Sequence, residues 1–142
     1  MRPLRVIAVI FLVTATATAT FAQQISTVGD ILNQGGRKLS KEEIQRLYMG
    51  ATVSGHRWGM PEITFQNKLL PDGTVTGTAL RNGQVVASIS GRWSITNNAQ
   101  TCFDLNNNTE HNCFYYYNLS NRYYAAQSED KSAPAYERQF TR

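Results

Sequence analysis

The chain has 142 residues, of which 42% are hydrophobic and 17% are charged, and its formal charge at pH 7 is +4. This length suits one domain with one hydrophobic core. The positive charge is too small to indicate a protein that binds nucleic acid or an anionic surface, since two of the cations lie in a segment that we expect to be removed.

The N-terminus has the order of features of a secretory signal peptide. A start with two arginines is followed by an apolar run, Val6–Val13, and by a small-residue stretch that ends at Ala22. The apolar run is shorter than the roughly 20 residues that a transmembrane helix needs. We therefore predict that residues 1–22 are cleaved, which leaves residues 23–142 with a formal charge of +2 (4 minus the two arginines), no membrane anchor and a periplasmic or secreted location.

Two helical segments are expected before the first strand. Residues 23–38 are mostly polar, and "STVGDILNQ" within them can form a short helix. Ser40 and Glu43 then have the spacing of a capping box. Three apolar side chains follow at helical spacing on one face: Ile44, Leu47 and Tyr48. This pattern predicts an amphipathic helix over Lys41–Met49.

After Gly50 the apolar period changes from that of a helix to that of a strand. Short alternating segments are separated by turn signals at Pro71–Gly73, Asn82–Gly83, Asn97–Gln100 and Ser120–Arg122. About eight strands with no helix between them indicate an antiparallel meander. We expect residues 39–142 to be one mainly β domain, a small barrel or a half-barrel whose open edge the helix covers.

The clearest strand spans Gln84–Thr96. Alternation places five apolar side chains on one face: Val85, Ala87, Ile89, Trp93 and Ile95. Gly91 interrupts this face, and a glycine inside a strand indicates a bend or a bulge.

Cys102 and Cys113 are the only cysteines in the chain. In an exported protein such a pair is expected to be oxidised. Placing them opposite each other gives a hairpin with a four-residue loop, Asn106–Thr109, a common hairpin length. A redox motif would separate the cysteines by two residues. A zinc site with His111 and a carboxylate is the other alternative, which oxidation on export disfavours.

The segment "GHRWGMPE" is the first candidate for function. We expect it to form a loop at one end of the sheet that brings together His56, Arg57, Trp58 and Glu62. The loop could contact a ligand, with His56 and Glu62 as an acid–base pair. The simpler alternative is a surface loop whose tryptophan covers the end of the barrel.

Aromatic residues on the later strands are the second candidate. Tyr115 and Tyr117 share a face with the second cysteine, and Tyr123 follows on the next strand. Together with Trp93 they could line a ligand cavity, because tyrosine combines an apolar ring with a polar tip. The alternative is a packed sheet with cross-strand aromatic pairs. We assign no catalytic residue, metal ligand or cofactor.

The order of these features resembles a family of small exported β-meander proteins, grouped as a domain of unknown function and found mainly in proteobacteria. The resemblance covers about Leu39–Tyr124. It rests on Gly50, Asp72-Gly73, Gly91-x-Trp93, Cys102 and Cys113. It implies a periplasmic or secreted, lipocalin-like sheet with a bridged hairpin, and it carries over no catalytic residues.

Three functions remain open from the sequence. We favour a non-enzymatic accessory protein that binds a small apolar or aromatic molecule, or an envelope or extracellular protein, through the open end of its sheet. The second hypothesis is a small hydrolase or isomerase that uses His56 and Glu62. The third is an enzyme inhibitor that presents the bridged loop 106–111. The first predicts a pocket, the second places His56 beside it, and the third predicts a filled core.

Overall fold

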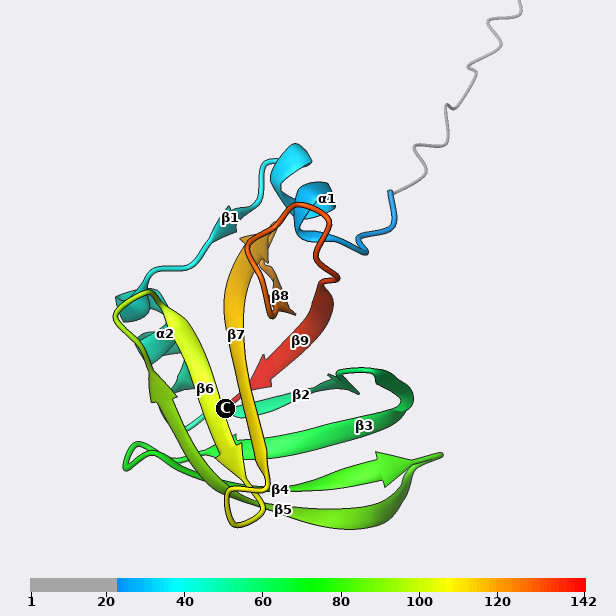
Figure 1. Cartoon of the computed structure of the whole chain (residues 1–142), viewed down its shortest axis with the longest axis vertical. Coiled ribbons are helices and arrows are strands. Elements are labelled where there is room, and N and C mark those ends of the chain that lie inside the picture. Colours follow the sequence, from blue (N-terminus) through cyan, green and yellow to red (C-terminus); the bar gives the residue numbers. More distant parts are fainter. Residues whose placement is uncertain (1–22) are drawn as a thin grey trace, which may run out of the picture.

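The structure, a computed structural model, describes residues 23–142, and the predicted signal peptide lies outside the described residues (Figure 1). Two short helices and nine strands follow one another in the described part of the chain. Their bounds are α1 Val28–Asn33, β1 Arg37–Lys38, α2 Lys41–Tyr48, β2 Thr52–Arg57, β3 Met60–Leu69, β4 Thr74–Arg81, β5 Gln84–Ile95, β6 Gln100–Leu105, β7 Glu110–Leu119, β8 Arg122–Ala126 and β9 Tyr136–Thr141.

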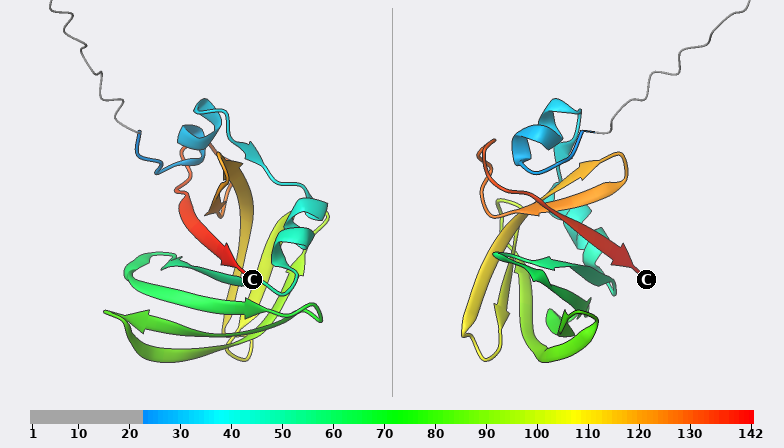
Figure 2. Two further views of the ribbon diagram at one scale, coloured as in Figure 1. Left: turned by 180° about the vertical axis from the view of Figure 1, so that it is seen from behind. Right: turned by 90° about the vertical axis from the view of Figure 1, so that its right-hand side faces the viewer.

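The strands β2 to β9 form a closed antiparallel barrel (Figures 1 and 2). Each strand pairs with the next, and β9 returns to pair with β2, where Phe140 lies opposite Val53. The short strand β1 pairs with the second half of β7, with Lys38 opposite Tyr117, while β6 pairs with the first half. The predicted meander is confirmed, and it closes as a barrel rather than a half-barrel.

Helix α2 closes one end of the barrel. Ser40 and Glu43 form the predicted capping box, in which the Ser40 Oγ accepts a hydrogen bond from the Glu43 amide and the Glu43 carboxylate accepts one from the Ser40 amide. Tyr48, on the apolar face, is fully buried. Its ring centroid lies 5.5 Å from those of Trp93 and Tyr116 and 5.6 Å from that of Phe140. This aromatic cluster fills the α2 end of the barrel.

Helix α1 covers part of the outer surface of the barrel. Val28 and Ile31 are fully buried against Tyr117 and Tyr124, which project outward from β7 and β8. A Thr27–Asp30 capping box begins the helix, as short polar side chains at these positions favour. In the described part of the chain, neither helix is long and apolar enough to cross a membrane.

Gly91 allows β5 and β6 to approach closely. A Cβ at this position would lie 2.1 Å from the Asp104 carbonyl oxygen and 2.8 Å from the Leu105 Cα, so only glycine fits. The pairing of β5 with β4 has its break in register elsewhere, beside Ala79. Beyond this break Val85 is 61% exposed, because the tip of the hairpin extends past the barrel, so this member of the apolar face is not buried.

The segment predicted to be a loop around His56 is instead a hairpin. Strands β2 and β3 pair up to Arg57 opposite Met60, and only Trp58 and Gly59 form the turn. Gly59 has a φ of +69°, the left-handed conformation that glycine supplies without strain. The prediction missed the hairpin because Pro61 and the glycines suggested a break, whereas the proline sits near the start of β3, where strands tolerate it.

Candidate functional site

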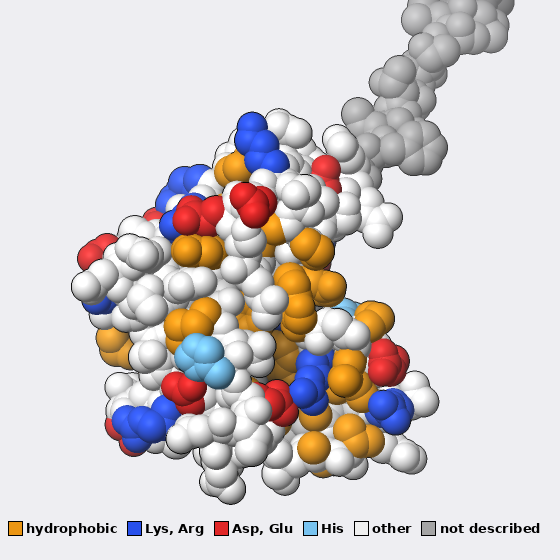
Figure 3. Space-filling model, in the orientation of Figure 1, with side chains coloured by type: hydrophobic (Ala, Val, Ile, Leu, Met, Phe, Trp, Pro, Cys, Tyr) orange, Lys and Arg blue, Asp and Glu red, His pale blue; other side chains and the backbone are white. Residues whose placement is uncertain are grey.

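A cavity of about 270 Å³ occupies the end of the barrel opposite α2. Figure 3 shows its mouth as a hollow with hydrophobic side chains inside and charged side chains at its edge. The cavity extends between the β2–β3 and β6–β7 hairpins, which leave this end uncovered. Its lining comes from most strands of the barrel: Val53, Arg57, Trp58, Met60, Phe65, Asn67, Ala79, Ala87, Ile89, Phe103, Leu105, Asn106, Glu110, Asn112, Phe114, Tyr116 and Arg138.

The walls of the cavity are mainly apolar and aromatic. Phe103 and Phe114 project inward from β6 and β7, and Phe65 does so from β3. Trp58, at the turn of the β2–β3 hairpin, packs against Phe114 and Tyr136, with ring centroids 6.0 and 4.8 Å apart. Such walls suit the apolar part of a small molecule, since ligand pockets are mostly apolar with a few placed polar groups.

A salt bridge spans the mouth of the cavity. Arg57 Nη2 lies 2.9 Å from Glu110 Oε2, and this contact joins the ends of the β2–β3 and β6–β7 hairpins. Asn106 Nδ2 donates a second hydrogen bond, of 3.1 Å, to Glu110 Oε1. The Arg57 and Glu110 side chains are 41% and 30% exposed, so water reaches this edge of the cavity.

Among the described residues that line the cavity, Arg138 is the one charged residue that is buried, with 4% of its surface exposed. It projects inward from β9, and its Nη1 donates a 3.0 Å hydrogen bond to the Glu137 carbonyl oxygen. The guanidinium carbon lies 5.1 Å from the Phe65 ring centroid. Gly55 provides space for it, because a Cβ there would lie 2.8 Å from Arg138 Nη1.

Arg138 has no anionic partner among the described residues. The ion pairs of residues 23–142 do not include it. Burial raises the pKa of the neighbouring Tyr116 phenol above its ordinary value, so this side chain is neutral and does not balance the charge. Burial also lowers the pKa of Arg138, yet arginine keeps its proton in proteins.

Asn67 is the second buried polar residue of the lining. The residue is 7% exposed, and its Oδ1 is buried with no hydrogen-bond partner in the described structure. Gly77 makes room for it on the neighbouring strand, because a Cβ at Gly77 would lie 2.3 Å from Asn67 Oδ1. Buried polar atoms usually have partners, so Asn67 marks a place where a polar ligand atom could bind.

The bridged hairpin has the predicted register. Cys102 lies opposite Cys113, and the two are joined by a disulfide. The predicted four-residue loop also forms, and Asn106 and its two following asparagines have φ values of +53°, +60° and +62°. Asparagine tolerates this conformation better than most residues, which explains the run of three. The bridge thereby fixes the strands that carry Asn106 and Glu110 to the cavity mouth.

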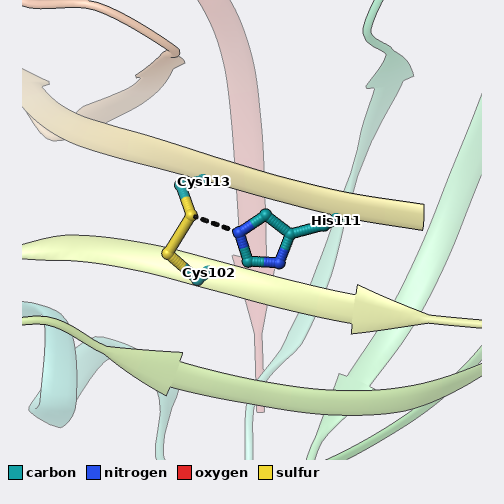
Figure 4. A group of neighbouring side chains, drawn as sticks. All are labelled: Cys102, His111 and Cys113. Carbon is teal, nitrogen blue, oxygen red and sulfur yellow. Dashed lines mark hydrogen bonds between the residues drawn. A yellow bond between two sulfur atoms is a disulfide. The ribbon is translucent and has the colours of Figure 1, made fainter. Parts of the chain in front are cut away.

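His111 lies beside the disulfide (Figure 4), and its side chain is exposed to solvent. Its Nε2 is 3.4 Å from Cys113 Sγ, and its Nδ1 contacts the Asp104 carboxylate. The three possible metal ligands Cys102, His111 and Cys113 lie within 4.8 Å of one another. The disulfide, however, removes the thiolates that a zinc site requires. The exposed His111–Asp104 pair is expected to contribute little to stability.

Of the six residues predicted to contact a ligand, the structure places only Trp58 in the cavity lining. His56 is exposed on the outside, where its Nδ1 lies 2.7 Å from the Pro61 carbonyl oxygen. Glu62 instead approaches Arg81, at 3.8 Å. The predicted His56–Glu62 pair therefore does not face the cavity.

The other predicted aromatic residues serve the packing of the barrel. Trp93 belongs to the cluster at the α2 end, and its Nε1 donates to the Leu70 carbonyl oxygen at 3.0 Å. Tyr117 and Tyr115 point outward, where Tyr117 packs under α1. Tyr123 contacts the Phe140 ring, with centroids 5.4 Å apart. Closure of the barrel turns the opposite face of β7, with Phe114 and Tyr116, into the cavity wall.

Arg138 and Asn67 are site residues that the sequence analysis missed. A signal for Arg138 is present in "YERQF", where alternation puts it on one face with Tyr136 and Phe140. A charged residue between two aromatics of one strand face indicates either a wet face or a buried charge. Asn67 gives no comparable signal, because "TFQNKLL" does not reveal which face is inside.

Comparison of the chain with protein-family models, with curated proteins and with solved structures found no match. The resemblance to exported β-meander proteins therefore stays a prediction.

Proposed function

We propose that this protein is an exported, non-enzymatic binding protein that holds a small, largely apolar molecule in the end of its barrel. The observation that carries the proposal is the 270 Å³ cavity with its aromatic and aliphatic walls. A cavity of this size suits a ligand of on the order of ten non-hydrogen atoms, since a water molecule takes about 30 Å³ in the liquid. It is smaller than the pockets of about 300–1,000 Å³ that hold drug-sized ligands.

Export is supported by two independent features. The N-terminal sequence has the basic, apolar and small-residue order of a signal peptide. The disulfide between Cys102 and Cys113 fits an oxidising compartment such as the periplasm or the extracellular space. A periplasmic or secreted location would also bring the open end of the barrel into contact with small molecules outside the cytoplasm.

Binding is favoured over catalysis by the composition of the cavity lining. The described residues that line it include no serine, cysteine or histidine, and their one carboxylate, Glu110, forms a salt bridge with Arg57. The hydrolase or isomerase alternative relied on His56, which lies outside the cavity. The inhibitor alternative, in which loop 106–111 binds a partner enzyme, expects a filled barrel, whereas this barrel is partly hollow.

The two tryptophans provide a direct test. Trp58 lines the cavity and Trp93 does not, so the variant Trp93→Phe leaves one reporter at the site. We expect 8-bromooctan-1-ol, a neutral molecule with a quenching bromine, to quench Trp58 emission saturably. The matched variant Trp58→Phe, which keeps only Trp93, should show weak and non-saturating quenching.

A cavity-filling variant provides the second part of the test. Ala79 is 3% exposed and lines the cavity, so Ala79→Leu places extra carbon atoms in the binding space. We expect this variant to bind the bromoalcohol at least about tenfold more weakly. The added carbon atoms occupy space that the ligand needs, so at least about one methylene group of the ligand loses its contacts with the cavity. Equal quenching of Trp58 and Trp93, or no effect of Ala79→Leu, would contradict binding in the cavity.

A further inference from the structure

We propose that the ligand carries a carboxylate and that Arg138 binds it inside the barrel. This inference rests on the proposed function and adds the chemical class of the ligand. The preferred molecule is a small monocarboxylic acid with an aliphatic or aromatic body. Four observations lead to it: the charge of the cavity lining, the free donors of Arg138, the cost of burying that side chain, and the polarity of its surroundings.

The charged groups that line the cavity do not balance. Arg57 and Glu110 neutralise each other at the mouth, at 2.9 Å. Arg138 is the third charged residue of the lining and leaves the cavity with one net positive charge. A ligand with one negative charge restores neutrality, whereas a cationic ligand would add a second uncompensated charge in a poorly solvated site.

The guanidinium of Arg138 has donors available for a ligand. Arginine has five N–H groups in a planar fork, and one hydrogen bond, from Nη1 to the Glu137 carbonyl oxygen, is formed within the described structure. A planar fork matches the two oxygens of a carboxylate, and such charge-assisted pairs are among the stronger hydrogen bonds in proteins. A hydroxyl or an amide on the ligand would fill only part of this fork.

The burial of Arg138 indicates that an unpaired charge is kept at this position for recognition. Arg138 is 4% exposed as a whole residue, so its guanidinium has lost most of its hydration. The Phe65 and Tyr136 rings, with centroids 5.1 and 5.9 Å from the guanidinium carbon, replace part of that hydration through cation–π contacts. Space for the side chain also depends on Gly55, since a Cβ there would lie 2.8 Å from Arg138 Nη1.

The remaining lining fixes the rest of the ligand. The aromatic and aliphatic walls have no charge to pair with a second ionised group, so a dicarboxylate would leave one carboxylate unpaired. Asn67 presents a buried side-chain amide whose Oδ1 has no partner in the described residues. It can pair with one further polar atom, which makes hydroxylated monocarboxylic acids compatible with the site.

A matched pair of probes tests the inference in the Trp93→Phe background. Quenching of Trp58 gives the dissociation constants of 8-bromooctanoate and of 8-bromooctan-1-ol, which share the same apolar chain. We expect the carboxylate to bind at least about tenfold more tightly, as hydrogen bonds to charged groups imply. In Arg138→Met we expect that preference to disappear, because the carboxylate loses its charged partner and therefore loses more affinity than the alcohol does.

Arg122→Met is the matched control, because it removes one positive charge from β8, where Arg122 pairs with Glu137 outside the cavity. It should keep the preference for the carboxylate. A wild-type protein that binds both probes equally, or an Arg138→Met variant that keeps the preference, overturns the inference and leaves the proposed function standing. Failure of the wild-type protein to bind either probe contradicts both the inference and the proposed function. A circular dichroism spectrum establishes that each variant is folded.

Discussion

At the residue scale, the site is defined by polar side chains that lie in an apolar environment. Arg138 and Asn67 are polar residues held inside an apolar barrel, and glycines at positions 55 and 77 leave the space that they occupy. Residues of this kind reduce stability, because buried polar groups with too few partners lose hydration that is only partly replaced. Natural sequences retain such residues most often where function requires them.

Replacement of Arg138 by methionine is expected to stabilise the free protein. The substitution keeps a long, flexible side chain and removes an unpaired buried charge, so the free energy of unfolding should rise by about 1–3 kcal/mol. Loss of the cation–π contact with Phe65 offsets roughly 0.5–1 kcal/mol of this gain. Urea denaturation of the unreduced protein measures the change. A less stable variant would indicate that Arg138 is retained for packing rather than for binding.

At the element scale, the disulfide fixes the strands at the mouth of the barrel, and helix α2 fixes its closed end. The disulfide holds β6 to β7 close to the hairpin tip that carries Asn106 and Glu110. Helix α2 inserts Tyr48 into the opposite end, and Glu43 joins the start of the helix to Arg37 through hydrogen bonds of 2.6 and 2.8 Å.

Removal of the disulfide should lower stability without changing the fold. The double variant Cys102→Ala, Cys113→Ala opens a loop with a sequence separation of 11 residues. The chain-entropy model then gives a loss of about 3 kcal/mol in the free energy of unfolding. Urea denaturation measures this loss. Thiol titration of the denatured, unreduced wild-type protein provides the check on the premise, and two free thiols there would contradict it.

The start of α2 should make stability depend on pH in the acid range. The hydrogen bond from Arg37 and that from the Ser40 amide lower the pKa of Glu43 from 4.5 to about 2. A carboxyl whose pKa is lowered in the folded state contributes stability above pH 4.5, and this contribution disappears as the pH falls toward 2. In Glu43→Gln the contribution is absent at every pH.

Unfolding curves between pH 6 and pH 2 therefore measure this contribution. The difference in unfolding free energy between the wild-type protein and Glu43→Gln should be largest near pH 6 and should shrink as the solution is acidified. Glu42→Gln is the matched control, since Glu42 lies in the same turn and forms no ion pair with a described residue. A difference between wild type and Glu43→Gln that is constant with pH would contradict the assigned role of the carboxylate.

At the scale of the whole molecule, barrel closure assigns every strand an inside and an outside. One end is filled by the aromatic cluster around Tyr48, and the other retains a cavity with Arg138 on its wall. Stability and binding are thus separated along the barrel axis. This separation explains why the two tryptophans differ, with Trp93 in the closed end and Trp58 beside the cavity.

The export of the whole chain is open to a direct measurement. We expect full-length protein expressed in a Gram-negative host to be found in the periplasm or medium, with an N-terminus at Gln23. Intact mass spectrometry of the purified protein measures the cleavage and the disulfide together. Deletion of Val6–Val13 should keep the chain in the cytoplasm, and no N-terminal residue other than Met1 should be removed. An intact N-terminal segment on exported protein would argue against the predicted signal peptide.

Several features of the fold could be read from local patterns in the sequence. The capping box at Ser40, the turn at Asn82–Gly83 and the hairpin register of Cys102 and Cys113 were all predicted and are confirmed. Each depends on residues that are close in sequence, where spacing alone determines the geometry. The end of strand β2 was harder to predict from the sequence. Gly55 and Gly59 are typical of a loop, and only the pairing of β2 with β3 shows that the segment is a hairpin.

Which residues line the cavity depends on the tertiary structure. Alternation shows that Phe114 and Tyr116 face away from Tyr115 and Tyr117, but it does not show which pair lies inside the barrel. That choice depends on the pairing of β9 with β2 and on α1 covering the outer tyrosines, both of which are contacts between distant segments. The sequence by itself determined a bridged β-meander with a capped helix. Closure of the barrel placed Arg138 inside it, because the inner face of each strand is fixed only when the last strand meets the first.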